Sequence, residues 1–270
     1  MSTRIAFIGG GNMASAIIGG LVKQGLAPGQ IEVVEPFADA RARLQQQFGV
    51  AAQEHAGPSL ASAATVVWAV KPQTFKEAAA QARAHVQRAL HLSVAAGIRS
   101  DSMAAWLATQ RIVRSMPNTP ALVGKGMTAL FARAAVSADD KQQVERIVAT
   151  TGEYLWVQQE QHLDAVTALS GSGPAYVFYF LEAMTQAGAE MGLDAEQARR
   201  LAVGTFAGAS ELARASSEPL QLLRERVTSK GGTTYAALTS LEQDNVKSSF
   251  VKALHAACKR AEELGDEFGK

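Results

Sequence analysis

Residues 7–17 read "FIGGGNMASAI", and this stretch decides the fold. It contains Gly9-x-Gly11-x-x-Ala14, follows a run of apolar residues typical of a strand, and opens an amphipathic helix. This is the setting of the dinucleotide-binding fingerprint. Gly9 permits a tight turn, Gly11 lets the backbone approach a pyrophosphate, and Ala14 allows close packing of helix on strand. The alternative is a glycine turn with a purely structural role.

Short β-rich runs alternate with helical ones from this stretch to about Phe131, as in "RIAFIG", "MASAIIGGLVKQG" and "IEVVE". Further strands are expected at residues 127–132 and 154–157, with a helix that starts near Ala138 between them. Such alternation is typical of βαβ units around a parallel sheet. We therefore predict an α/β protein whose residues 1–160 form an N-terminal Rossmann-type, doubly wound sheet.

The pattern changes at about Leu163, where strand-like runs end and long Ala-rich helical segments follow. Residues 161–270 are therefore predicted to form an all-helical C-terminal domain. Small residues such as Gly204, Ala207 and Gly208 would let helices approach closely. They fit core packing within one monomer as well as a helix-exchanged dimer.

The composition excludes several classes of protein. The chain has 270 residues, 47% of them hydrophobic and 19% charged, with a formal net charge of +1. This balance is that of an ordinary globular protein, and without a basic patch we expect a small metabolite rather than nucleic acid as the ligand. Cys258 is the only cysteine, which favours a reducing compartment, by default the cytoplasm. No signal peptide and no membrane-spanning run are expected.

The cofactor type is left open by the residues after the second and third strands. Glu35 ends the second strand and would accept a hydrogen bond from the ribose 2′-OH of NAD. Arg41 and Arg43 follow; they could reach the 2′-phosphate of NADP or be ordinary solvated arginines. Lys71 and Pro72 follow the third strand. They could form a rim of the cofactor site, or they could simply be the start of a helix.

The helical half lacks the usual acid–base groups for reducing a ketone. There is no lysine between Lys141 and Lys230, and the one histidine in that range is His162. Scattered histidines and a lone cysteine also predict no metal site. A ketone needs a proton donor at oxygen, whereas a protonated imine is already electrophilic at carbon. An imine substrate, for which positioning carries most of the catalysis, fits this inventory better.

The stretch "VTSKGGTT", residues 227–234, lies between two helical segments. Backbone N–H groups at a helix start and nearby hydroxyls can hold a substrate carboxylate. The predicted carboxylate ligands are Ser229, Gly231, Gly232 and Thr233. Thr234 is predicted to bond the imine or amine nitrogen. The alternative is a Ser/Thr-rich interhelical turn with an N-cap.

Five motifs occur in the order and spacing of one known family: "FIGGGNMA", "AVKP", "SMPNTPALVGKGMTAL", "ALSGSGPAYVF" and "VTSKGGTT". On these the chain resembles pyrroline-5-carboxylate reductase over nearly its whole length, and the last three motifs are specific to that family. The resemblance implies reduction of 1-pyrroline-5-carboxylate to L-proline by NADPH or NADH, the last step of proline biosynthesis. It also implies that residues 161–270 are the substrate-binding and dimerisation domain, in a homodimer that can assemble further, for example into a decamer.

The resemblance also implies the site residues. The cofactor-binding residues are Ile8, Gly9, Gly11, Asn12, Met13, Ala14, Glu35, Ala69, Val70, Lys71, Pro72, Asn118 and Pro174. The substrate-binding residues are Ser229, Gly231, Gly232, Thr233 and Thr234, of which Thr234 is catalytic. Lys230 stands where the family commonly has a proline, and Glu35 where it often has a small hydroxyl residue.

Three alternatives remain open on the sequence: a β-hydroxyacid reductase, another imine reductase, and a non-catalytic dinucleotide-binding sensor. The absence of a lysine between Lys141 and Lys230, where the helix joining the two domains is expected, argues against the first. The sensor would need the glycine turn but not the residue 227–234 loop.

Overall fold

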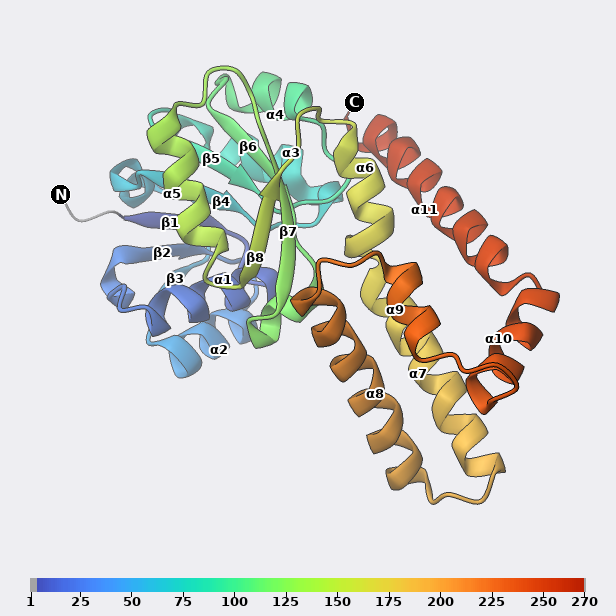
Figure 1. Ribbon diagram of the computed structural model, residues 1–270. Helices are drawn as coiled ribbons and strands as arrows, with labels where there is room; N and C mark the ends of the chain where they lie inside the picture. Colours follow the sequence, from blue (N-terminus) through green and yellow to red (C-terminus); the bar gives the residue numbers. More distant parts are fainter. Residues whose placement is uncertain (1–3, 270) are drawn as a thin grey trace. The chain divides into compact units, whose positions relative to one another are not determined.

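The computed structural model describes residues 4–269 and divides into two compact units (Figure 1). The first unit comprises residues up to Ser172 together with those from Ala257 onward, and the second is Gly173–Ala256. The end of the chain therefore packs with the first unit, where Asp266 accepts a hydrogen bond from the Arg99 guanidinium at 3.1 Å. The domain boundary between residues 160 and 161 stays a prediction.

The first unit contains an eight-stranded sheet in the order β3-β2-β1-β4-β5-β6-β7-β8. All neighbouring strands are parallel except β6 and β7, which are antiparallel. The strands are β1 (Ile5–Ile8), β2 (Ile31–Val34), β3 (Ala52–Gln53), β4 (Thr65–Trp68), β5 (Leu90–Ser93), β6 (Ile112–Met116), β7 (Gly126–Ala132) and β8 (Gly152–Trp156). The predicted Rossmann-type sheet is confirmed; the two-residue strand β3 was not predicted.

Helices cover both faces of this sheet (Figure 1). They are α1 (Asn12–Lys23), α2 (Ala38–Phe48), α3 (Pro72–Ala82), α4 (Ser100–Leu107), α5 (Ala138–Val148) and α6 (His162–Val166), with short 3-10 helices at Pro28–Gln30, Pro58–Ser62, Arg83–His85 and Thr119–Val123. Strand side chains alternate between the faces, so β1 directs Phe7 to the core under α1 and α5, and Ile8 to the core under α3 and α4. Burial of both faces explains the nearly continuous apolar strands.

The second unit is all-helical, as predicted. Its helices are α7 (Gly173–Glu190), α8 (Ala195–Ala215), α9 (Leu220–Arg226), α10 (Thr233–Gln243) and the part of α11 (Val246–Phe268) that precedes Ala257. A Cβ on Gly188 would lie 2.8 Å from the Ala198 Cβ, so a glycine lets α7 and α8 approach closely. By contrast, a Cβ on Gly204 or Gly208 would meet no atom of this chain within 4 Å. These two small residues on α8 therefore do not pack into a core of the single chain.

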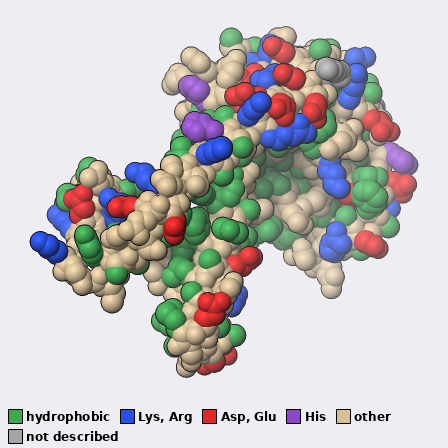
Figure 2. Space-filling view, turned by 90° about the vertical axis from the view of Figure 1, so that its right-hand side faces the viewer, with side chains coloured by type: hydrophobic (Ala, Val, Ile, Leu, Met, Phe, Trp, Pro, Cys, Tyr) green, Lys and Arg blue, Asp and Glu red, His purple; other side chains and the backbone are tan. Residues whose placement is uncertain are grey.

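The surface of the second unit carries many exposed apolar side chains, shown green in Figure 2. They include Phe178 and Tyr179 of α7 and Leu201 and Leu212 of α8. Within residues 4–269, no helix combines the length and the apolar character needed to span a membrane.

Candidate active site

The glycine turn between β1 and α1 has the geometry of an anion-binding site. Gly9 has φ +97°, and a Cβ there would lie 2.5 Å from the Ala69 carbonyl oxygen, so only glycine fits. Gly11 is the N-cap of α1, has no side-chain cap, and has open space where a Cβ would be. Because the first N–H groups of a helix have no intrahelical acceptor, this turn fits the pyrophosphate of a dinucleotide.

The other predicted residues of this turn surround it as expected for the fingerprint. Ala14 is fully buried, which allows α1 to pack closely on the sheet, and Ile8 is buried in β1. Asn12 is exposed and Met13 half-buried in the first turn of α1. The structure therefore brings these four residues together at the carboxyl end of β1.

The rim after β4 lies directly beside the glycine turn, since β1 pairs in parallel with β4 and Ile8 is opposite Trp68. Lys71 is the exposed N-cap of α3, and Pro72 occupies the first helical position, where its missing N–H costs nothing. A Cβ on Gly9 would lie 3.1 Å from the Val70 side chain. The glycine turn after β1 and the segment after β4 therefore lie side by side at the carboxyl edge of the sheet.

Glu35 joins the same edge from the end of β2. The Gly10 N–H donates to its Oε2 at 2.7 Å, and the Phe37 N–H donates to its Oε1 at 2.9 Å. Gly10, the middle glycine of the "GGG" run, was not among the predicted site residues. Its role depends on a carboxylate 25 positions away: the sequence indicated Glu35 as a ribose ligand, but not Gly10 as a donor to it.

Asn118, which follows β6, uses its side chain inside the protein. Its Nδ2 donates to the Ser170 carbonyl at 3.1 Å, and its Oδ1 accepts from the Met127 N–H at 2.9 Å. Ser170 lies in a π-helical turn, Thr167–Gly171, of a kind often found at functional sites. An amide has two N–H donors, so one remains for a ligand. The cofactor contact of Asn118 stays a prediction, alongside a bracing role that the sequence did not suggest.

The loop before α10 belongs to the second unit. Gly231 has φ +74°, and Gly232 is the N-cap of α10 with no side-chain cap. A Cβ on Gly232 would lie 2.6 Å from the Ser229 Oγ, so the serine hydroxyl lies over the helix start. The first N–H groups of α10, at Thr233 and Thr234, therefore lie beside this hydroxyl without a capping side chain.

One predicted donor of the carboxylate nest has an acceptor within the loop. The Gly232 N–H donates to the Ser229 carbonyl at 3.0 Å, closing a turn, so it is not a free donor for a ligand. Gly232 instead contributes by lacking a side chain at the helix start. The other predicted donors are the Ser229 hydroxyl and the N–H groups of Gly231 and of the first turn of α10.

Pro174, the remaining predicted cofactor residue, is the second residue of α7 and so belongs to the second unit. His162 begins α6 and is exposed. Between Arg4 and Gly269, no three His, Cys, Asp or Glu side chains are grouped so that they could hold a metal ion.

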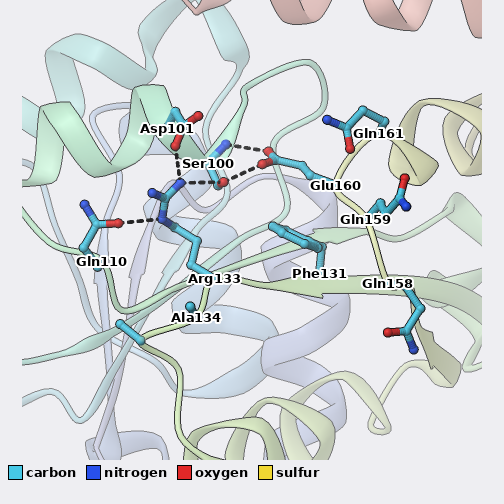
Figure 3. A pocket seen from close by; sticks show the side chains of 11 residues that line it. Ser100, Asp101, Gln110, Phe131, Arg133, Ala134, Gln158, Gln159, Glu160 and Gln161 are labelled. Carbon is cyan, nitrogen blue, oxygen red and sulfur yellow. Dashed lines mark hydrogen bonds and ion pairs between the residues drawn. The ribbon is translucent and has the colours of Figure 1, made fainter.

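A separate polar pocket of about 540 Å³ lies in the first unit and contains none of the predicted site residues (Figure 3). Several of its polar side chains bond one another. Arg133 pairs with Asp101 and also bonds Ser100 and Gln110, while Glu160 accepts from the Ser100 N–H at 2.6 Å. These bonds tie the segment before α6 to α4, which is a structural role.

Comparison with known proteins identifies the family. Residues 160–264 match the domain "Pyrroline-5-carboxylate reductase dimerisation", and residues 4–97 match "NADP oxidoreductase coenzyme F420-dependent". A pyrroline-5-carboxylate reductase of Pseudomonas aeruginosa is 44% identical over 273 residues, covering 100% of both chains. The solved structure of a pyrroline-5-carboxylate reductase from Coxiella burnetii is 38% identical, with TM-score 0.90, covering 98% of this chain and 99% of that one. A Plasmodium falciparum pyrroline carboxylate reductase with NADP bound is 28% identical, with TM-score 0.87 and coverage of 97% and 98%. The chain therefore belongs to the pyrroline-5-carboxylate reductase family.

Proposed function

We propose that this enzyme reduces 1-pyrroline-5-carboxylate to L-proline, the last step of proline biosynthesis, through the residues described above. In the reaction the imine carbon gains a hydride, the imine nitrogen gains a proton, and the C=N bond becomes a single bond. The observation that carries the proposal is the uncapped start of α10 beside Ser229, in a family member with no lysine between Lys141 and Lys230.

NADPH or NADH, when bound, supplies the hydride from its nicotinamide ring. We assign its pyrophosphate to the glycine turn, because α1 starts there without a side-chain cap. Further support comes from the Plasmodium relative, which binds NADP. The proposed contacts are those predicted from the sequence: Ile8, Gly9, Gly11, Asn12, Met13, Ala14, Glu35, Ala69, Val70, Lys71, Pro72, Asn118 and Pro174.

The substrate carboxylate is assigned to the loop before α10. The Ser229 hydroxyl and the N–H groups of Thr233 and Thr234 are donors, and the positive end of the α10 dipole favours the anion. The left-handed backbone at Gly231 and the missing side chain at Gly232 keep the approach open. The Thr234 hydroxyl bonds the substrate nitrogen and is the proposed catalytic residue.

The assembly is a homo-oligomer, as the matched dimerisation domain indicates. Our proposal adds that residues 161–270 form the dimerising and substrate-binding domain, that dimers can assemble further, for example into decamers, and that the enzyme works in the cytoplasm.

The test is a steady-state assay of pyrroline-5-carboxylate reduction, followed by nicotinamide absorbance. Thr234→Ala should lower kcat, and Ser229→Ala should chiefly raise KM for the imine. Hydrogen bonds to charged groups contribute about 1.5–3 kcal/mol, so each change should be on the order of tenfold to a hundredfold.

Thr239→Ala is the matched control, because Thr239 lies on the same helix and its hydroxyl bonds the Tyr235 carbonyl of α10 itself. It should keep wild-type kinetics. Wild-type kinetics in both loop variants, or loss of nucleotide affinity in both, would show that the loop is an ordinary interhelical turn.

A further inference from the structure

The end of β2 holds a carboxylate in one fixed orientation. Glu35 is only 6% exposed, and both of its oxygens accept backbone N–H groups, from Gly10 at 2.7 Å and from Phe37 at 2.9 Å. The first of these donors belongs to the glycine turn itself. A nucleotide on that turn therefore has its adenosine ribose next to a fixed negative charge.

Arg41, the nearest arginine on α2, is engaged inside the protein. Its Nη1 donates to the carbonyl oxygens of Glu35 at 2.9 Å and Pro36 at 2.7 Å. Its Nη2 forms an ion pair with Glu54 at 3.2 Å. The guanidinium thus braces the backbone beside Glu35, and its charge is compensated by a second carboxylate.

Arg43 does not replace Arg41 at this place. Two residues along a helix turn the side chain by about 200°, so Arg43 leaves α2 on another side and is exposed there. Arginines that accept a 2′-phosphate in NADP-binding sheets lie near the end of this strand. In this chain the arginine in that place already has its partners.

We propose that the end of β2 selects NADH over NADPH, with Arg41 acting as a positioning residue for Glu35 and not as a phosphate ligand. A ribose 2′-hydroxyl can donate to a carboxylate, whereas a 2′-phosphate carries roughly two negative charges and repels it. Repulsion between two like charges a few ångströms apart near a protein surface lowers affinity on the order of tenfold to a hundredfold. The inference rests on the dinucleotide site of the proposed function.

Calorimetric titration with ADP-ribose and 2′-phospho-ADP-ribose tests it without any turnover. The wild-type enzyme should bind the phosphorylated probe tenfold to a hundredfold more weakly. Glu35→Gln should bring the two dissociation constants together. Glu54→Gln, at a half-exposed position, should release Arg41 and improve binding of the phosphorylated probe.

Glu32→Gln is the matched control, since it removes a charge from the same strand about 10 Å away, where the Glu32 carboxylate accepts a hydrogen bond from the Gln53 side chain. It should leave the ratio unchanged. Arg41→Met should not weaken the phosphorylated probe selectively. The proposal would be overturned if Arg41→Met selectively weakened binding of the phosphorylated probe, or if the wild type bound both probes equally well.

Kinetics separate this inference from the proposed function. Reduction of pyrroline-5-carboxylate by NADH at least tenfold more efficiently than by NADPH supports both. Reduction that is equally efficient with NADPH overturns the selectivity alone. Absence of reduction with either nucleotide, while ADP-ribose still binds with the expected discrimination, overturns the function and leaves the nucleotide selectivity standing.

Discussion

The two units of this chain differ in how they bury their apolar side chains. The first has two cores, one on each face of its sheet, with fully buried residues such as Phe7 and Trp68. In the second, the buried apolar side chains among Gly173–Ala256 are those of two alanines, Ala198 and Ala202. Its larger apolar side chains are mostly exposed in the single chain.

This difference shows where each unit gets its stability. Exposed apolar patches of this extent mark interaction surfaces, and a dimerisation domain spans this region. The first unit has a core of its own, so its stability is a property of the chain. We expect the second unit to complete its core in the homo-oligomer, so that its stability depends on protein concentration.

The largest expected effect comes from placing a charge on the exposed face of α8. Leu201, 59% exposed in the single chain, should become buried between subunits. Burying a leucine side chain stabilises the dimer by about 1.5–3 kcal/mol, and burying an unpaired carboxylate in its place costs several kcal/mol more. In a symmetric dimer each of these free energies counts twice. Leu201→Asp should raise the dimer dissociation constant on the order of a thousandfold or more, measured by sedimentation equilibrium.

Leu122→Asp is the matched control in the first unit, where Leu122 is 55% exposed. It should sediment as the wild type does. If it dissociates the dimer equally well, exposed apolar residues of both units serve assembly and the comparison fails. A wild-type monomer of 28.5 kDa that is stable at micromolar concentration and fully active would also contradict it.

A second prediction concerns the core of the first unit, where His91 on β5 is buried and its ring stacks on that of Trp68. Its Nδ1 accepts a hydrogen bond from Trp68 Nε1 at 3.0 Å, so a proton there would set two donors against each other. Burial lowers the pKa of His91 from 6.5 to about 4, and the Val86 backbone opposes this only in part. The folded state therefore favours the neutral ring.

The sign of the pH effect follows from this lowered pKa. The unfolded chain takes up a proton below about pH 6.5 and the folded one only near pH 4, so stability is lost as pH falls through this window. The loss attributable to His91 reaches about 3 kcal/mol. Denaturant titrations from pH 7 to pH 4 should show a clearly smaller loss for His91→Gln than for the wild type. Equal slopes for the two proteins would contradict the assignment.

The two units also show which features of the fold and the site can be predicted from the sequence. Strands buried on both faces and the Gly9–Ala14 fingerprint carry local signals, so the sheet and the pyrophosphate turn could be predicted. The helix start at Gly232 could also be found from its glycines and hydroxyls. In each of these cases the chemistry is set by residues close together in the chain.

The features that could not be predicted depend on contacts between residues far apart in the sequence. The return of the chain end to the first unit rests on contacts such as Arg99 with Asp266, 167 positions apart. Arg41 pairs with Glu54, and the Gly232 N–H donates to the Ser229 carbonyl. In both cases the sequence offers several other possible partners nearby. Sequence spacing predicts that donors are present, but not which acceptor each one finds.

The smallest expected effect gives the sharpest test of the difference between the two units. It compares two helix N-caps, one in each unit. The Ser137 side chain caps α5 by accepting from the Asp140 N–H at 3.1 Å, and the Asp194 side chain caps α8 by accepting from the Gln197 N–H at 2.8 Å. Both acceptors serve the third residue of their helix, and replacing either by alanine costs about 1 kcal/mol.

If the two units derive their stability as argued, these equal costs should appear in different transitions. Ser137→Ala should lower by a few degrees a calorimetric transition whose midpoint is independent of protein concentration, since α5 packs on the core of the first unit through Val144 and Ile147. Asp194→Ala should lower instead a transition whose midpoint rises with concentration, because α8 is completed by the second subunit. Scans at concentrations a hundredfold apart separate the two. If both variants shift one and the same transition, the units unfold together, and the contrast in burial does not divide the molecule into independently stable parts.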